Sequence, residues 1–443
     1  MQPEPSTDAQ PSGPLTWIAM AIAMMLAVVS IGQMWRYGAR MPGIDYYQFW
    51  VVGTELREGH ADAIYSVSQR AEFGKKWLEV ASQEKTSRLY SAARRREQLE
   101  TFSTPWLYTL FAWSVTGDYE RDYKWFLAGS MTISVAAIVA ICRSFRVSVT
   151  MTALWVAFCF GCFQPLKSDV AVGNVNQLQL GGIALYILSQ SRMSGWKAHL
   201  SGGLILGLMI AFKPNLGFAF AMLMAFWIAS AAWGKLLGQM IGSFIALGLA
   251  ISASSMMFGT VTCWVQWTAS LSELMGTQNL PIEAGNFSPS ALLQHLGRSG
   301  HSQEFLPALS LLMMIVIVSD SFRRTPISDQ ARRDQDVLIM GLGTIVMLLG
   351  SKLAWVHYFE LLIPAAIYCV TAGLSRAHSL VGSRDGLMAV IAVLLVALIP
   401  VKWVIGFHNF TLPAVLCLLG TVMLAVQLVR ELRSLRHQST SLA

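Results

Sequence analysis

Charge is scarce in this sequence: Asp, Glu, Lys and Arg make up 13% of its 443 residues, whereas hydrophobic residues make up 54%. A soluble domain of average composition carries about 25% charged residues. The abundance of apolar residues excludes a disordered chain, and the scarcity of charge excludes an ordinary cytosolic enzyme. Several nearly uncharged stretches of roughly 18 or more residues instead predict an all-α integral membrane protein with many spans.

The sequence also has few cysteines and lacks the common motifs of soluble-cofactor chemistry. Its six cysteines lie almost entirely within apolar runs, which favours thiols packed between helices over a disulfide framework. No H-E-x-x-H, Walker A, G-x-S-x-G or G-x-G-x-x-G motif occurs in a useful context. The one close D-x-D, Asp334 to Asp336, follows Arg332 and Arg333, with which we expect it to pair. We therefore expect no cofactor and no metal.

Apolar runs predict about twelve membrane-spanning helices. The first, Leu15–Met34, follows a Pro- and Ser-rich tail, residues 1–14, that we expect to be disordered. The others lie near 124–142, 147–163, 176–190, 199–212, 214–233, 236–258, 305–319, 336–350, 354–373, 386–402 and 411–429. The run Pro105–Gly117 would reach only about 20 Å as a helix, which is too short to span comfortably. We predict that it is interfacial or re-entrant.

The distribution of Lys and Arg predicts the orientation of the spans. With the N-terminus in the cytoplasm, the short cytoplasmic loops and the C-terminal tail hold 14 Lys and Arg residues, against 5 in the short opposite loops. This positive-inside bias predicts cytoplasmic termini, one membrane domain over residues 15–429, and a basic cytoplasmic tail over residues 430–443. Since the protein is predicted to lie in the membrane, its net charge of +7 does not indicate a nucleic-acid partner.

The first loop on the side opposite the cytoplasm is the longest, from about residue 36 to 123. Apolar residues alternate with many charges over about 66–100, which predicts amphipathic helices lying on the membrane surface. The basic run Arg94 to Arg96 either contacts lipid headgroups or a lipid-linked anion, or is a solvated helix face.

Unusual polar motifs collect at the predicted outer ends of the spans, as expected for an active site at the lipid–water boundary. Asp45 closely follows the first span, where a carboxylate is placed to act as a general base for a hydroxyl proton. An ordinary helix N-cap is the alternative. Lys213, between two spans, either snorkels or neutralises a phosphate. His357 is either a packing residue or, with Lys352, a contact for an anionic leaving group.

Amide side chains are also concentrated at one of these outer ends. Asn174, Asn176 and Gln177 stand together in the motif GNVNQ at a predicted helix start. Helix capping explains one of them, whereas three favour a polar ligand such as a sugar.

Six motifs in order resemble glycosyltransferase family 87, the polyprenyl-phosphate-sugar-dependent membrane transferases of the GT-C superfamily, which include the mannosyltransferases of phosphatidylinositol mannoside synthesis. They lie between about residues 43 and 365. They are DYYQFWVVGTELREG, continuing to Tyr65, then STPW, GNVNQL, the Lys213–Pro214 pair, NFSPSALL, and HY followed by LLIP.

The resemblance implies a GT-C-type bundle in the plasma (inner) membrane with a periplasmic active site. Asp45 matches the family's acidic residue and would deprotonate an acceptor hydroxyl, which then attacks the anomeric carbon of a polyprenyl-phosphate hexose or pentose with inversion and without a metal. The acceptor would be a lipid-linked or cell-envelope glycan. Lys213 and His357, from matched motifs, and Lys352, by proximity, would hold the donor phosphate. The sugar or acceptor contacts would be Asn174, Asn176, Gln177, Tyr46 and Asn286.

Three other functions are alternatives to this one. A transporter or flippase of lipid-linked sugars needs a polar path, yet apart from the Lys213–Pro214 break the central spans carry almost no charge. An O-antigen ligase usually has its large outer loop late in the chain, whereas here it comes first. The third alternative is a non-catalytic assembly protein, for which Asp45→Asn would leave the function intact.

Overall fold

The computed structural model describes residues 13–277, 282, 285–297, 329–375, 380–398 and 410–440, and these form helices without any strand. This confirms the predicted all-α membrane fold class. Many of the helices begin where a short polar side chain can bond a free backbone N–H. The side chains of Thr104, Asp118 and Ser148, for example, accept hydrogen bonds from the first turns of α5, α6 and α7.

Six segments in the described part of the chain are long and apolar enough to cross a membrane, judged by length and composition. They are α1 (Pro14–Gly38), α6 (Tyr119–Ser144), α10 (Gly195–Phe212), α12 (Trp233–Phe258), the segment Val356–Ser375 formed by η5 (Val356–Leu362) and α17 (Ile363–Ser375), and α19 (Thr411–Thr440). The helices α7 (Val149–Gly161) and α8 (Gln164–Val172) meet at a 55° bend and make a seventh span if counted together.

Shorter helices complete the bundle. They are α9 (Asn176–Arg192), which packs on α6; α11 (Gly217–Ala229), which packs on α16 (Asp329–Gly350); α18 (Leu380–Val396), which packs on α19; and the short elements η2 (Pro214–Leu216) and α14 (Pro289–His295). The predicted span at 305–319 and the end of that at 386–402 lie outside the described residues. The predicted number of twelve spans is therefore not confirmed.

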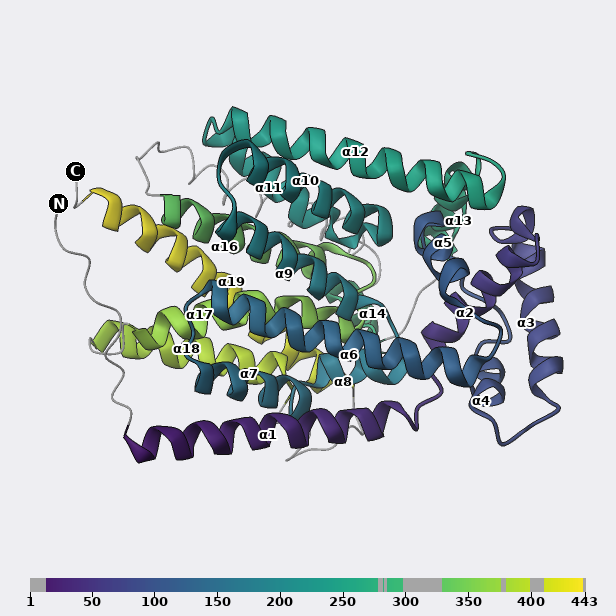
Figure 1. Ribbon diagram of the computed structural model, residues 1–443, viewed down its shortest axis with the longest axis horizontal. Coiled ribbons are helices and arrows are strands. Elements are labelled where there is room, and N and C mark those ends of the chain that lie inside the picture. Colours follow the sequence, from purple (N-terminus) through teal and green to yellow (C-terminus); the bar gives the residue numbers. More distant parts are fainter. Residues whose placement is uncertain are drawn as a thin grey trace.

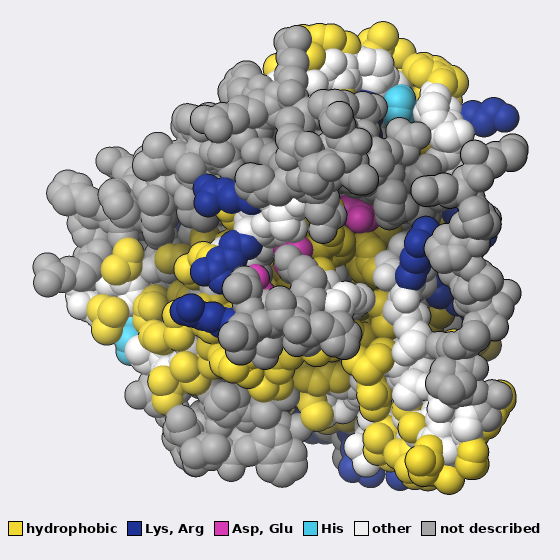
Figure 2. Space-filling model, turned by 90° about the vertical axis from the view of Figure 1, so that its left-hand side faces the viewer, with side chains coloured by type: hydrophobic (Ala, Val, Ile, Leu, Met, Phe, Trp, Pro, Cys, Tyr) yellow, Lys and Arg dark blue, Asp and Glu magenta, His cyan; other side chains and the backbone are white. Residues whose placement is uncertain are grey.

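The two ends of the bundle differ. The N-terminal end of α1 and the C-terminal end of α19 lie at one end, on the left of Figure 1. Figure 2 shows this face, with Lys and Arg side chains placed around its hydrophobic middle. Exposed Arg143, Arg192, Lys197 and Arg433, all assigned to the cytoplasm by the charge count, come from the helix ends on this side. The predicted basic tail at 430–443 is, as far as Thr440, a continuation of α19.

The long connection between α1 and α6 forms a cap at the opposite end (Figure 1). It contains α2 (Ile44–Arg57), η1 (Ala61–Ala63), α3 (Val67–Ala81), α4 (Arg88–Arg95) and α5 (Pro105–Ser114), and α13 (Cys263–Thr277) lies beside α5. The predicted helices within 66–100 are present as α3 and α4, and α3 runs across the direction of α1 and α6. The short helix α5 is largely buried and packs against α2 and α12.

Candidate active site

Asp45 lies in the first turn of α2, where the cap meets the bundle. The N-cap of this helix is Gly43, so Asp45 is not the capping residue that the alternative interpretation proposed. Its carboxylate instead points to two partners from elsewhere in the chain. Oδ2 accepts a hydrogen bond of 2.7 Å from Asn174 Nδ2, and Oδ1 lies 3.1 Å from a guanidinium nitrogen of Arg96.

Two glycines allow the turn before Asp45 to approach the turn before Asn174. Gly43 (φ 67°) and Gly173 (φ 68°) both have left-handed backbone conformations, which favour glycine. A Cβ atom on Gly173 would lie 2.8 Å from Tyr46 Cβ and 3.4 Å from Gly43 Cα, and one on Gly43 would lie 2.3 Å from the Tyr123 ring. The absence of side chains at both positions therefore brings α2 against the α8–α9 turn.

Lys213 occupies the break between α10 and η2, and it does not snorkel away from the protein. Its ammonium donates hydrogen bonds to Asn174 Oδ1 (2.9 Å) and Asn176 Oδ1 (2.7 Å), and lies 4.4 Å from the centre of the Tyr358 ring. Burial lowers the pKa of Lys213 to about 8, because the ammonium loses hydration, although Asp169 and Asp45 oppose this shift. The result is a partly buried cation with a preset orientation.

The amides of GNVNQ connect this lysine to a second carboxylate. Asp169 Oδ1 accepts from Asn176 Nδ2 at 2.9 Å, and Asp169 Oδ2 accepts from Gln177 Nε2 at 3.1 Å. None of the three amides caps α9, whose N-cap residue is Val175 and has no side-chain cap. Asn174 and Asn176 each bond Lys213 and a carboxylate, whereas Gln177 bonds Asp169 and accepts from the Ser134 hydroxyl of α6.

Three carboxylates surround this lysine, and they differ in access. Asp169 and Glu360 are both 0% exposed, whereas the Asp45 side chain is 13% exposed. Neither oxygen of Glu360 has a hydrogen-bond partner among the described residues. Asp45 is thus the carboxylate of the three that a substrate hydroxyl can reach.

His357 lies at the start of η5 and joins the cluster through its backbone. Its carbonyl oxygen accepts a hydrogen bond of 3.2 Å from Asn176 Nδ2. The buried ring packs between Trp355 and Tyr358, and its Nε2 has no partner in the described part of the chain.

Two predicted sugar contacts lie differently from the rest. The ring of Tyr46 is buried in an aromatic cluster with Phe111, Tyr119, Tyr123 and Phe126, and no hydrogen bond links it to the Lys213 network. Asn286 uses its amide to hold the chain near residue 352: Nδ2 donates to the Lys352 carbonyl, and Oδ1 accepts from Ala354 N. This clamp fixes the segment that carries Lys352 and leads to His357.

The cap contributes Arg96, from the basic run for which the sequence left open an anion contact or a solvated helix face. Its guanidinium bridges Asp45 and Glu100, at 3.1 and 2.9 Å. The Nε atom of Arg96 is buried without a partner among the described residues. Burial raises the pKa of Glu100, and the charge of Arg96 opposes this.

Another cluster of polar side chains in the described part of the chain lies away from this network. Glu55, Glu58 and His60 are close enough together to be metal ligands. However, the Lys76 ammonium bonds both carboxylates, at 2.8 and 3.1 Å, and balances part of their negative charge.

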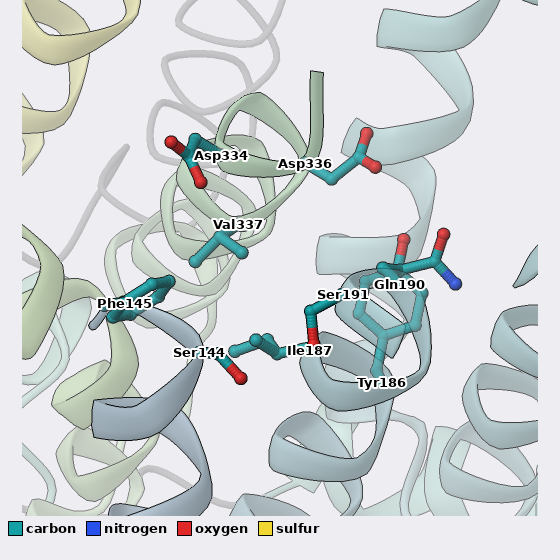
Figure 3. A pocket seen from close by; sticks show the side chains of 9 residues that line it. All are labelled: Ser144, Phe145, Tyr186, Ile187, Gln190, Ser191, Asp334, Asp336 and Val337. Carbon is teal, nitrogen blue, oxygen red and sulfur yellow. The ribbon is translucent and has the colours of Figure 1, made fainter. Parts of the chain in front are cut away.

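Near the predicted inner ends of α6, α9 and α16, a cavity of about 20 Å³ has room for about one water molecule and not for a sugar (Figure 3). Asp336 on its wall bonds Trp227 Nε1 and Lys235, whereas the side chains of Arg332 and Arg333 lie outside the described residues. The predicted pairing with these two arginines therefore stays a prediction, and the partner that the structure gives Asp336 is a distant lysine, Lys235.

Sequence reasoning did not single out Asp169, Glu360 or Tyr358, although Asp169 stands four residues before the GNVNQ motif and the other two stand within three residues of His357. Their distinguishing property is that a carboxylate or phenol sits inside a short polar run next to an apolar helix. Only the fold brings Asp169 and Glu360 to the same lysine, since about 190 positions separate them in the sequence.

Comparison with known proteins adds one match. A model of glycosyltransferase family 87 matches residues 104–351, more than half of the chain. The matched segment contains Asp169, the GNVNQ amides and Lys213, whereas Asp45 and His357 lie outside it. No curated protein and no solved structure matches the chain.

Proposed function

Since the chain belongs to glycosyltransferase family 87 and is a membrane glycosyltransferase, we propose that it transfers a hexose or pentose from a polyprenyl-phosphate sugar to a hydroxyl group. The acceptor is a lipid-linked or cell-envelope glycan. The reaction takes place on the periplasmic face of the plasma (inner) membrane, at the cluster around Asp45. The observation that supports this most is the pairing of one accessible carboxylate with a cation through a single amide, Asn174.

In the proposed reaction, Asp45 accepts the proton of the acceptor hydroxyl. The hydroxyl oxygen forms a bond to the anomeric carbon as the bond from that carbon to the phosphate oxygen breaks, with inversion. The leaving polyprenyl phosphate takes the electron pair. Because phosphate is already a good leaving group, the protein needs only to neutralise its developing charge.

Lys213 is the best-placed cation for that phosphate. Two amide oxygens and the Tyr358 ring fix its ammonium, so little reorganisation is needed when charge develops. The further candidates for the phosphate are His357, whose Nε2 has no partner among the described residues, and Lys352, which lies five residues before it on the segment that Asn286 holds. Asn174, which is 7% exposed, is the amide that we assign to a sugar as well as to this network, whereas the fully buried Asn176 belongs to the network alone. Gln177 and Tyr46 support the surrounding structure.

Sugar transfer by Asp45→Asn tests the proposal. Purified protein in lipid is offered a panel of radiolabelled polyprenyl-phosphate sugars and crude membrane acceptors. Loss of a general base lowers transfer by about 10²- to 10⁴-fold. The matched control is Asp385→Asn, because Asp385 also lies 3.1 Å from an arginine, Arg430, but is near the opposite end of the bundle. Equal transfer by wild type and a folded Asp45→Asn protein would remove Asp45 from the chemistry.

A further inference from the structure

Asp169 is a fully buried carboxylate that the proposed reaction does not use. It lies in α8, and its two oxygens accept hydrogen bonds from two consecutive residues of α9, Asn176 and Gln177. Because no part of Asp169 is exposed, a substrate cannot touch it. Its effect on a reaction must pass through the residues that it binds.

The hydrogen bonds of Asp169 determine which end of the Asn176 amide faces Lys213. Asn176 Nδ2 is occupied by Asp169 Oδ1 (2.9 Å) and by the His357 carbonyl (3.2 Å). Its Oδ1 therefore faces the other way and accepts from the Lys213 ammonium at 2.7 Å. With the amide reversed, two donors would face each other, which is unfavourable in a buried site.

Asn174 repeats this arrangement on the other side of the same ammonium. Its Nδ2 donates to Asp45 at 2.7 Å, and its Oδ1 accepts from Lys213 at 2.9 Å. The lysine is thus joined to two carboxylates, Asp45 and Asp169, and one amide separates it from each. The two carboxylates attract the ammonium through separate amides.

From this juxtaposition we infer that Asp169 is a positioning residue. Acting through Asn176, it keeps the Lys213 ammonium from forming a direct ion pair with Asp45. A direct pair would occupy the base and turn the cation away from the donor phosphate. This inference rests on the proposed function, because it assigns Asp45 and Lys213 their roles in sugar transfer.

The first test is Asp169→Asn, measured by the pH dependence of transfer. The substitution removes a negative charge that favours the ammonium form of Lys213. We expect kcat to fall at least 10-fold, donor KM to change by less than about 3-fold, and the alkaline limb of kcat/KM to move to lower pH. The groups that act on the same ammonium are Asp45 of α2 and Glu360, His357 and Tyr358 of η5. All are unchanged in this variant.

A second variant keeps the inference testable if Asp169→Asn does not fold. Asn176→Leu preserves the size of the side chain and leaves Asp169 one partner, Gln177, but it breaks the bridge to Lys213. It should reproduce the loss of kcat. In the double variant, the losses should not multiply, because both substitutions interrupt the same connection.

The control is Asp336→Asn, which removes another buried carboxylate that bonds a lysine, near the opposite end of the bundle. It should leave the pH profile of transfer unchanged. Two results would overturn this inference alone, provided that the wild type transfers sugar normally. One is an unaltered pH profile in Asp169→Asn, and the other is losses of kcat that multiply in the double variant. A folded wild type that transfers no sugar would overturn the proposed function and this inference with it.

Discussion

The contact between Gly173 and α2 gives a quantitative prediction about the site. In Gly173→Ala the new Cβ would lie 2.8 Å from Tyr46 Cβ, an atom fixed to the backbone of α2. Rotation of a side chain cannot relieve this overlap, so the start of α2 must move away from the α8–α9 turn. The movement would lengthen the hydrogen bond from Asn174 Nδ2 to Asp45 Oδ2, now 2.7 Å.

Two terms contribute to the cost of this substitution. Placing alanine in the left-handed conformation of Gly173 costs about 1–2 kcal/mol. Overpacking against α2 adds about 1–3 kcal/mol. We therefore expect a destabilisation of about 2–5 kcal/mol, and a misplacement of Asp45 by about 1 Å would lower transfer about 100-fold.

Gly259→Ala is the matched control. Gly259 also follows a helix with a positive φ (71°), but a Cβ atom added there would have no neighbour within 4 Å. Only the conformational cost of about 1–2 kcal/mol applies at this position, and transfer should be nearly unchanged. Thermal unfolding and sugar transfer are measured for both variants in the same lipid. Equal destabilisation, or full activity in Gly173→Ala, would refute the role given to this close approach.

Three further outcomes are expected. The kcat/KM of wild type should fall as the pH rises above about 8, because Lys213 loses its charge there. Lys213→Arg should not show this alkaline decrease, since arginine keeps its charge. An unchanged decrease in the variant would assign it to another group. Transfer should be insensitive to EDTA, since Lys76 already neutralises the carboxylate of Glu55; inhibition reversed by a divalent cation would contradict this. Asp122→Ala should lower the free energy of unfolding by about 1–3 kcal/mol, because it leaves the buried Trp50 indole N–H without its acceptor and removes the acceptor of Thr116. An unchanged unfolding midpoint would oppose that role.

Much of the fold was predictable because apolar composition is a local property of the chain. The long runs gave α1, α6, α10, α12 and α19, and the short run after Pro105 gave a helix too short to span. The mixed apolar and charged segment gave α3 and α4. The number of spans was less predictable, because α7 and α8 form a bent pair and α11 has only 13 residues.

The candidate site was predictable in part. Asp45, Asn174, Asn176 and Lys213 were selected for their residue types, and the structure brings all four together. Which atoms meet depends on contacts between distant segments, so the sequence did not indicate that Arg96 pairs with Asp45.

Residue type was a weaker guide for the remaining residues. The type of Tyr46 did not indicate that its ring would fill an aromatic cluster, nor did the type of Asn286 indicate a clamp on the backbone. These depend on packing, which composition does not specify.

Formation of a glycosidic bond by the wild-type protein tests the central claim most directly. The purified protein is placed in vesicles with a radiolabelled polyprenyl-phosphate sugar and an acceptor extract, and both the labelled product and the side of the membrane that holds the donor are followed. The account predicts labelled acceptor and one equivalent of polyprenyl phosphate. Movement of intact donor across the membrane without labelled acceptor would contradict it and would indicate a flippase.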